Sequence, residues 1–358
     1  MQKITDQFPN LYSKILPEFF KQEVPDESLA TCANCAMLAP TEYPPLPGTQ
    51  YYLADVKCCT YFPKLPSYLV GGLLDDSDPA MEEGRRRIRK VIEAQIGVTP
   101  QGIAPPKKYS LLLKHGEPGF GKNRLLTCPY LDKQAGTCTV WLFRDAVCST
   151  YFCKTAAGQE GKKFWNVIKM YLLHLQDSLV WHCIHTMGMQ IERLWEYLNQ
   201  YATESLSAED LDDLQVPGEI YSTIWGNWLG REEEFYKECY RLVQGLDPGQ
   251  LQSLAGINQK IYLALLKNCL HDVLSPELPP VLKRNPEMKA IPLPNGKYGI
   301  VTVSGSFTIE AALYEVLGFF DGAATTQQIA EHVKRQYNDT LDNTLLIPLY
   351  HHRMLIPA

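Results

Sequence analysis

The sequence predicts a mainly α-helical protein with a loop-rich N-terminal part and a small α+β domain at its C-terminal end. Apolar residues recur at helical spacing within residues 160–201, which indicates helices that bury one face. Residues 31–70 are dense in proline, which lacks a backbone donor and restricts the residue before it. Alternating residues from Tyr298 to Val303 indicate a strand in the last part of the chain.

The chain of 358 residues is long enough for two or three domains. Its character changes near residue 160, and a second proline-rich stretch follows the helical part. We therefore expect a cysteine-rich domain at 1–158, a helical domain at 159–275, a linker at 276–296 and the α+β domain at 297–358.

The elements are expected in the following order. Short helical turns in residues 1–30 precede the proline-rich loops. The next elements are a helix at 79–96, a strand at Tyr109–Lys114, two helices within 160–201 that meet near Gly188, and helices at 207–214, 218–245 and 258–273. In the last domain the strand precedes helices at 309–319, 325–337 and 341–353.

Composition excludes several classes of protein. Hydrophobic residues make up 45% and charged residues 21% of the chain, which is typical of a globular protein and not of a disordered one. Lys and Arg number 34 against 40 Asp and Glu, giving a net charge of -6. This mild acidity argues against a nucleic-acid partner, because such proteins need a basic face.

The N-terminus shows no charged region followed by a continuous apolar core, so we expect no secretory signal. The most apolar long stretch, Val167 to Ile184, is interrupted by Lys169 and Asp177, so we also expect no membrane span. These observations predict a cytoplasmic protein. Cysteines stay reduced in that compartment, and a dense cluster of them indicates metal binding or catalysis rather than disulfides.

Eleven cysteines are present, and eight of them lie within one third of the chain. In chain order these eight form two groups of four: Cys32, Cys35, Cys58 and Cys59, then Cys128, Cys138, Cys148 and Cys153. Short spacings such as Cys-x2-Cys bring two sulfurs to one ion, and we predict that the eight are metal ligands. Adjacent Cys58 and Cys59 cannot easily both bind one ion, and which of them is a ligand stays open. The outlying Cys183, Cys239 and Cys269 are predicted to be core residues.

The order Cys-x2-Cys, adjacent Cys pair and CPYLDKQAGTCTVWLFRDAVCSTYFCK resembles the YkgJ-type cysteine-cluster family, described as a zinc- or iron-chelating domain. The resemblance rests on the eight cysteines and covers about residues 30–155. Arg144-Asp145 stands where that family usually has Arg-Pro, and Ser149 replaces its usual Arg. The resemblance implies a metal-binding domain. Flagellin lysine methylases look like distant relatives with a similar cysteine-rich iron–sulfur site.

Four thiolates either complete a tetrahedral zinc site or hold one iron–sulfur cluster. We favour a 4Fe-4S cluster because of the adjacent cysteine pair and the family resemblance, with zinc as the alternative.

Two other motifs are weaker. Gly116-x4-Gly121-Lys122 has the spacing of a phosphate-binding loop, but Asn123 replaces the required Ser or Thr and Pro129 leaves no room for a long helix. We therefore interpret this segment as a loop that leads into Cys128.

Histidines and arginines offer further candidates. His182 and His185 share one face of a helix and could bind a metal, but we interpret them, like His174, as packing residues. The basic run at 85–90 is predicted to be a solvated helix face.

The C-terminal domain, with ALYEVLGFFDGAATTQQIAEHV and a final MLIP, is similar to the small winged-helix, PqqD-like modules that recognise leader peptides. Its basic residues are outnumbered by acidic ones, which favours a peptide or protein partner over a nucleic acid. The basic residues are Lys297, Lys334, Arg335 and Arg353, and the acidic ones are Glu310, Glu315, Asp321, Glu331, Asp339 and Asp342.

These features support two functional hypotheses. The first is an iron–sulfur or other metal-dependent protein that modifies a peptide or protein by redox chemistry or methyl transfer. The second is a zinc-stabilised adaptor without chemistry of its own. The sequence identifies no catalytic acid or base.

Overall fold

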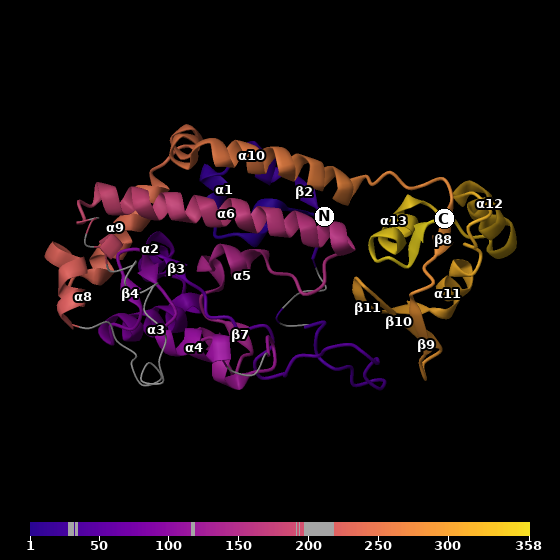
Figure 1. Ribbon diagram of the computed structural model, residues 1–358, viewed down its shortest axis with the longest axis horizontal. Helices are drawn as coiled ribbons and strands as arrows, with labels where there is room; N and C mark the ends of the chain where they lie inside the picture. Colours follow the sequence, from indigo (N-terminus) through magenta and orange to yellow (C-terminus); the bar gives the residue numbers. More distant parts are fainter. Residues whose placement is uncertain (28–31, 33–34, 116–118, 191, 193, 197–217) are drawn as a thin grey trace.

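The computed structural model describes residues 1–27, 32, 35–115, 119–190, 192, 194–196 and 218–358. It confirms a mainly α-helical protein. Within the described residues the sheets have two or three strands, whereas two long helices run side by side along the molecule (Figure 1). The helix predicted at 207–214 lies outside the described residues.

The two long helices are α6 (Gly158–Thr186) and α10 (Pro248–Leu274). They are antiparallel: Lys163 pairs with Asp272 over 3.8 Å, and the His174 ring lies 3.2 Å from the carbonyl of Ala255. Helix α6 ends beside Gly188, whose φ of 67° confirms the predicted break.

Helix α10 begins ten residues before the predicted start of its helix. Asp247 and Gln250 form a capping box with Pro248 at the first position, a strong start signal that the apolar spacing alone missed. Gly256, with φ 63° and ψ -154°, then interrupts the helix within its first part.

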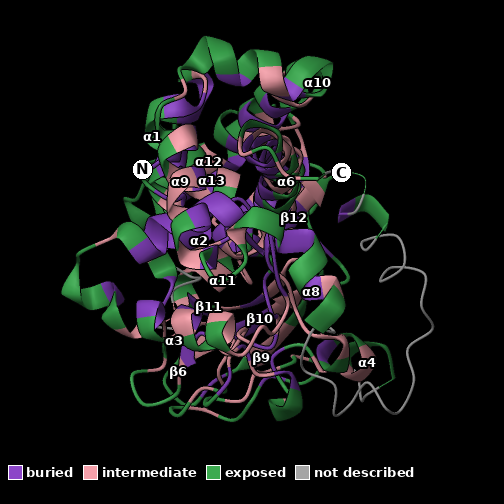
Figure 2. Ribbon diagram, turned by 90° about the vertical axis from the view of Figure 1, so that its left-hand side faces the viewer, coloured by how far each residue is buried: buried purple, intermediate pink, exposed green. Residues whose placement is uncertain are grey.

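One hydrophobic core unites the first two predicted segments. It extends from Ile4 to Val273, and its buried positions gather around α2 (Ser67–Asp75) in Figure 2. Helix α2 lies directly against α9 (Glu232–Gln244), since a Cβ on Gly71 would stand 1.7 Å from the Tyr236 carbonyl oxygen.

Short elements surround this core. The N-terminal turns are confirmed and are tied together by β1 (Gln2–Lys3) and β2 (Glu23–Val24), which pair antiparallel. Among the described residues, the other helices of this part are η1 (Ile4–Gln7), α1 (Tyr12–Ile15), η2 (Glu18–Lys21), η3 (Pro79–Met81), α3 (Glu82–Glu93), α4 (Lys107–His115), η4 (Arg124–Leu126), η5 (Trp141–Phe143), α5 (Ala146–Thr150), α8 (Gly218–Trp225) and η7 (Gly226–Trp228). The remaining strands are β3 (Leu65–Pro66), β4 (Val98–Thr99) and β5 (Gly102–Ile103) in one sheet, and β6 (Leu131–Asp132) and β7 (Thr137–Cys138) in another.

Two predictions in this part are wrong. The strand expected at Tyr109–Lys114 belongs to helix α4, where Tyr109 is buried and donates a hydrogen bond to the Thr60 carbonyl. The helix expected at 218–245 is two helices, because Gly226 and Gly230 have positive φ and end the first one.

The C-terminal part has a core of its own, which includes Leu282, Ile300 and Phe320. Strands β9 (Lys289–Pro292), β10 (Lys297–Thr302) and β11 (Gly305–Glu310) form an antiparallel sheet in the order β11-β10-β9. The helices are α11 (Ala311–Leu317), α12 (Thr326–Tyr337) and α13 (Asn343–His351), and β12 (Leu355–Pro357) pairs with β8 (Leu282–Arg284). Strands β8 and β9 lie in the stretch for which we expect a linker.

Specific contacts join the C-terminal part to the rest of the chain. The Lys154 ammonium donates to the Ser306 carbonyl over 2.7 Å, and the hydroxyls of Tyr43 and Thr308 lie 3.0 Å apart. On the other side of the hairpin formed by β10 and β11, the Glu160 carboxylate accepts from Arg353 over 2.6 Å. Lys154, which makes the first of these contacts, directly follows Cys153 in the sequence.

No described helix is long and apolar enough to cross a membrane.

Candidate metal centre

Five cysteines line one small cavity, which measures about 30 Å³. One of them is Cys59; the other four, Cys32, Cys35, Cys58 and Cys153, come from three distant parts of the chain. The grouping differs from chain order, because Cys153 joins the first set of thiols although it follows the other three cysteines of the second set. We call these four residues the first thiol group.

A tight turn before the adjacent cysteines directs Cys58 into the cavity. The Lys57 amide donates to the Leu53 carbonyl over 2.8 Å, and Lys57 itself has a φ of 50°. Its ammonium then donates to the carbonyls of Cys32 (2.7 Å) and Gly136 (3.1 Å). Lys57 therefore ties three chain segments together at the edge of the cavity.

The cavity is also bordered by Cys59, which links it to the rest of the cysteines. The Cys59 side chain packs partly against the hydrophobic core, and its carbonyl accepts from the amide of Cys128 over 2.8 Å. A hydrogen bond between the side chains of Cys58 and Cys59 is the main cause that raises the pKa of Cys58.

Cys128, Cys138 and Cys148 form a second thiol group. Cys138 lies on β7 opposite Leu131 of β6, and Cys148 lies in the first turn of α5, where the Asp145 carboxylate accepts from its amide over 2.9 Å. Asp145 is almost wholly buried, so the second thiol group has a carboxylate beside it.

Burial raises the pKa values of these thiols. It is the main cause that brings the pKa of Cys128 to about 12 and those of Cys138 and Cys153 to about 11. Neighbouring cysteines add to the rise: Cys35 and Cys58 act on Cys153, and Cys138 acts on Cys128. Without a cation the thiols are therefore protonated at neutral pH, and a metal would have to displace their protons.

The half-buried guanidinium of Arg144 is near cysteines of both groups. It donates to the carbonyls of Trp141 (3.0 Å) and Gln7 (3.2 Å) and stacks 3.4 Å above the Trp141 ring. Burial lowers the pKa of Arg144. The nearby cysteines raise it and so oppose that shift: Cys138, Cys148 and Cys32. A fixed cation here favours negative charge on the thiols of both groups.

Three aromatic rings close one side of the cavity. The hydroxyls of Tyr52 and Tyr151 are 2.8 Å apart, and the Phe120 ring packs edge-on against both. Both tyrosines line the cavity itself. Sequence reasoning missed them, because a tyrosine among loops carries no motif. Arg144 could have been found from its place inside the cysteine-rich segment.

The segment that resembles a phosphate loop lies beside the segment that carries Tyr52, because the Leu53 amide donates to the Gly121 carbonyl over 2.8 Å. Residues 116–118 lie outside the described residues. Further along, the Gly121 amide donates to Thr60 Oγ1 over 2.7 Å, and the amides of Lys122 and Asn123 both donate to the Gly119 carbonyl. These amides are used internally, which agrees with its interpretation as a loop.

The histidine candidates lie elsewhere, on α6. His182 is half-buried and His185 is exposed, and burial lowers the pKa of His182. Neither residue lines the thiol cavity. His174 contacts the α10 backbone as a packing residue would.

The three outlying cysteines are buried as predicted. Cys183 and Cys239 face one another between α6 and α9, where the Cys183 thiol lies 3.6 Å from the Cys239 carbonyl.

The donor chemistry of the first thiol group fits a thiophilic metal such as zinc or iron. In the described part of the chain, no set of three or more Cys, His, Asp or Glu has the spacing of a formed metal site. The four thiols would therefore have to draw closer together around an ion.

No family model, curated protein or solved structure matches this chain. We therefore infer its function from the fold and from the geometry of the site.

Proposed function

We propose that the chain is a thiolate metal protein whose first thiol group binds the metal. The observation that carries this proposal is the convergence of Cys32, Cys35, Cys58 and Cys153 from three separate segments on one cavity. Four buried or half-buried thiols from distant segments are difficult to explain by packing alone, because isolated small apolar side chains would serve as well. Arg144 supports the proposal by supplying a half-buried positive charge near thiols that become negative on metal binding.

An iron–sulfur cluster is the first candidate for the metal. Such clusters are held by four cysteine thiolates and are sensitive to solvent exposure. The rings of Tyr52 and Tyr151 line the cavity, and Phe120 packs edge-on against both. They would shield part of such a centre from water and oxygen. When bound, the cluster would supply electron transfer, while Lys57 and Arg144 would hold the surrounding backbone and offset its charge.

A single zinc ion is the second candidate, and the size of the cavity favours it. A volume of about 30 Å³ is close to the share of one water molecule in the liquid. Zinc would stabilise the loop-rich segments from which the four cysteines come, and the protein would then act as an adaptor.

The proposed partner is a peptide or another protein, bound by the C-terminal part. Two basic residues of the C-terminal part form ion pairs: Lys297 with Glu310 and Arg353 with Glu160, each over 2.6 Å. This pairing further weakens the case for nucleic acid. Because Lys154 contacts Ser306, a partner held by β10 and β11 would lie near the first thiol group, where a redox or methyl-transfer reaction on it could be carried out.

Anaerobic purification followed by iron, sulfide and zinc analysis tests the metal proposal. An iron–sulfur protein should be brown, with absorbance near ~400 nm that dithionite bleaches and with iron and sulfide in equal amounts. A colourless protein with stoichiometric zinc would establish the adaptor alternative. A folded chain that retains neither metal, even after reconstitution with each, would refute the proposal as a whole.

A further inference from the structure

The basic run on α3 is only in part the solvated face that its charge predicts: Arg86 and Lys90 are exposed, whereas the other three arginines make contacts within the protein. Arg85 is 6% exposed and donates to the carbonyls of Asp76 (2.7 Å) and Asp78 (3.0 Å). Arg89 pairs with Glu233 of α9 over 3.1 Å. Helix α3 is therefore fixed to the hydrophobic core, and its remaining arginines extend from a rigid support.

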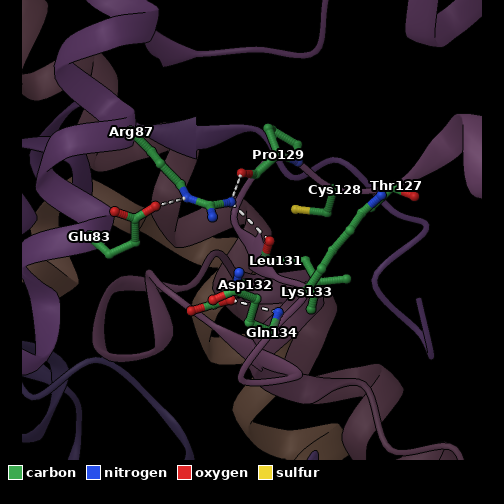
Figure 3. Close-up of a pocket in the computed structure, with 9 residues that line it drawn as sticks. All are labelled: Glu83, Arg87, Thr127, Cys128, Pro129, Leu131, Asp132, Lys133 and Gln134. Carbon is green, nitrogen blue, oxygen red and sulfur yellow. Dashed lines mark hydrogen bonds and ion pairs between the residues drawn. The ribbon is translucent and has the colours of Figure 1, made fainter. Parts of the chain in front are cut away.

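Arg87 extends from this support to the loop that follows Cys128. Its Nη1 donates to the carbonyls of Pro129 (2.5 Å) and Leu131 (2.9 Å), and its Nε donates to Glu83 over 2.7 Å. Figure 3 shows the guanidinium reaching from α3 to both carbonyls, with the Cys128 sulfur beside them.

The opposite side of the same loop is already held. The Cys128 amide donates to the Cys59 carbonyl over 2.8 Å, and the wholly buried Tyr130 ring packs edge-on against Phe62. On the Arg87 side the loop borders a wide hollow of about 770 Å³. Little side-chain packing restrains the loop there, so the two hydrogen bonds from Arg87 supply much of the restraint.

We propose that Arg87 is a positioning residue for the second thiol group: by holding the carbonyls of Pro129 and Leu131 it fixes the Cys128 thiol for a metal shared with Cys138 and Cys148. This inference rests on the proposed metal function and extends it to a second site. Groups that orient ligands in this way typically change metal affinity by about 10- to 100-fold when they are removed.

The test compares Arg87→Met with Arg86→Met on full-length, metal-loaded protein. Arg86 is a matched control, because it also pairs with Glu83 but is half exposed, and among the described residues its side chain bonds to that carboxylate alone. The amount of metal per chain and its rate of release to a chelator are measured beside the melting temperature. We expect Arg87→Met to lose the second-group metal about 10-fold or more faster, and Arg86→Met to behave as the wild type.

Arg87→Lys provides a variant that keeps the charge. A single ammonium cannot reproduce the planar fork that serves Glu83 and two carbonyls, so its release rate should lie between those of the wild type and Arg87→Met. This variant also serves if Arg87→Met does not fold.

Several outcomes would overturn the inference. If a folded Arg87→Met or Arg87→Lys chain released its metal at the wild-type rate, Arg87 would not position Cys128. The proposal for the first thiol group would not be affected by that result. If the Arg86 and Arg87 variants lost metal equally fast, the cause would be the change at Glu83 and in the charge of α3, and not the hydrogen bonds from Arg87 to the loop. A Cys128→Ser chain that keeps all its metal would remove the second site, whereas a wild-type chain without metal would refute both proposals.

Discussion

At the scale of single residues, Cys153 distinguishes the two ways of grouping the cysteines. Chain order places it with the second set of four, whereas in the structure it lines the cavity of the first thiol group. Cys153→Ser should remove the metal of the first thiol group, because a hydroxyl is a poor ligand for soft metals. Cys269→Ser is the control, since Cys269 is 4% exposed in the hydrophobic core and lies outside both groups. Metal analysis of both variants should show a loss only in the first. Retention of wild-type metal by Cys153→Ser would exclude it from the ligand set.

The raised pKa of Glu27 leads us to expect that the free energy of unfolding depends on pH. Its carboxylate accepts from Trp165 Nε1 and from the Ala156 amide, each over 2.7 Å, and burial raises its pKa to about 7. The folded state therefore binds a proton more tightly than the unfolded state does. Stability should fall as pH rises from about 4.5 to about 7, by about 3 kcal/mol in total.

Glu27→Gln is neutral at every pH and should remove this dependence. Urea unfolding between pH 5 and 8 should show the variant gaining stability relative to the wild type as pH rises. The exposed Glu23→Gln serves as the control and should follow the wild-type curve. Parallel curves for Glu27→Gln and the wild type would contradict the raised pKa.

The cysteines of the candidate site could be singled out from the sequence, but their grouping and the tyrosines beside them could not. Spacing singled out the eight cysteines because Cys-x2-Cys and an adjacent pair are rare by chance. Which thiols meet depends on the path of the chain after α5, and that path is set by packing of Trp165 and its neighbours on α6 against distant segments. No local pattern carries that information.

At the scale of elements, the contact between α2 and α9 depends on one glycine. Gly71→Ala would place a Cβ 1.7 Å from the Tyr236 carbonyl oxygen, and both are backbone positions within helices. The helices must then separate, which should cost about 1–3 kcal/mol or more.

Gly245→Ala provides the comparison at the end of α9. Its Cβ would meet nothing closer than 3.5 Å, and Gly245 has ordinary helical φ and ψ. This change should be neutral or slightly stabilising. Chemical denaturation of both variants measures the difference, and an unfolding free energy for Gly71→Ala equal to that of the wild type would contradict the close packing.

Elements with strong local signals were predicted well. The strand predicted at Tyr298–Val303 is β10, and the helix predicted at 325–337 is α12, which Thr325 and Gln328 start with a capping box. Helix α4 was mistaken for a strand because Leu111, Leu112 and Leu113 form a short apolar run, which fits either structure. Tertiary contacts of Tyr109 decide between the two structures, and a short apolar run cannot reveal them.

At the scale of the whole molecule, Glu160 joins the C-terminal part to α6. Its carboxylate accepts from Arg353 and lies 3.2 Å from the buried ring of His351. Glu160→Gln should weaken this joint, because removing one partner of a partly buried ion pair leaves the Arg353 guanidinium without compensation. Limited proteolysis should then cleave the connection after α10 faster than in the wild type.

Glu310→Gln is the matched control for that prediction. It removes an ion pair of the same 2.6 Å length, with Lys297, but one that lies within the C-terminal sheet and is exposed. Its cleavage rate should stay at the wild-type value. Equal cleavage of both variants would show that the joint depends on overall charge rather than on Glu160.

The order in which the first thiol group forms has a consequence for synthesis. Cys32, Cys35 and Cys58 leave the ribosome early, but their fourth partner, Cys153, follows only after most of the N-terminal half has been made. Until then the nascent chain carries three unshielded thiols that can react with oxidants or bind the wrong ion. A cell that makes this protein should therefore supply its metal after release of the N-terminal half, or protect those thiols with a chaperone during translation.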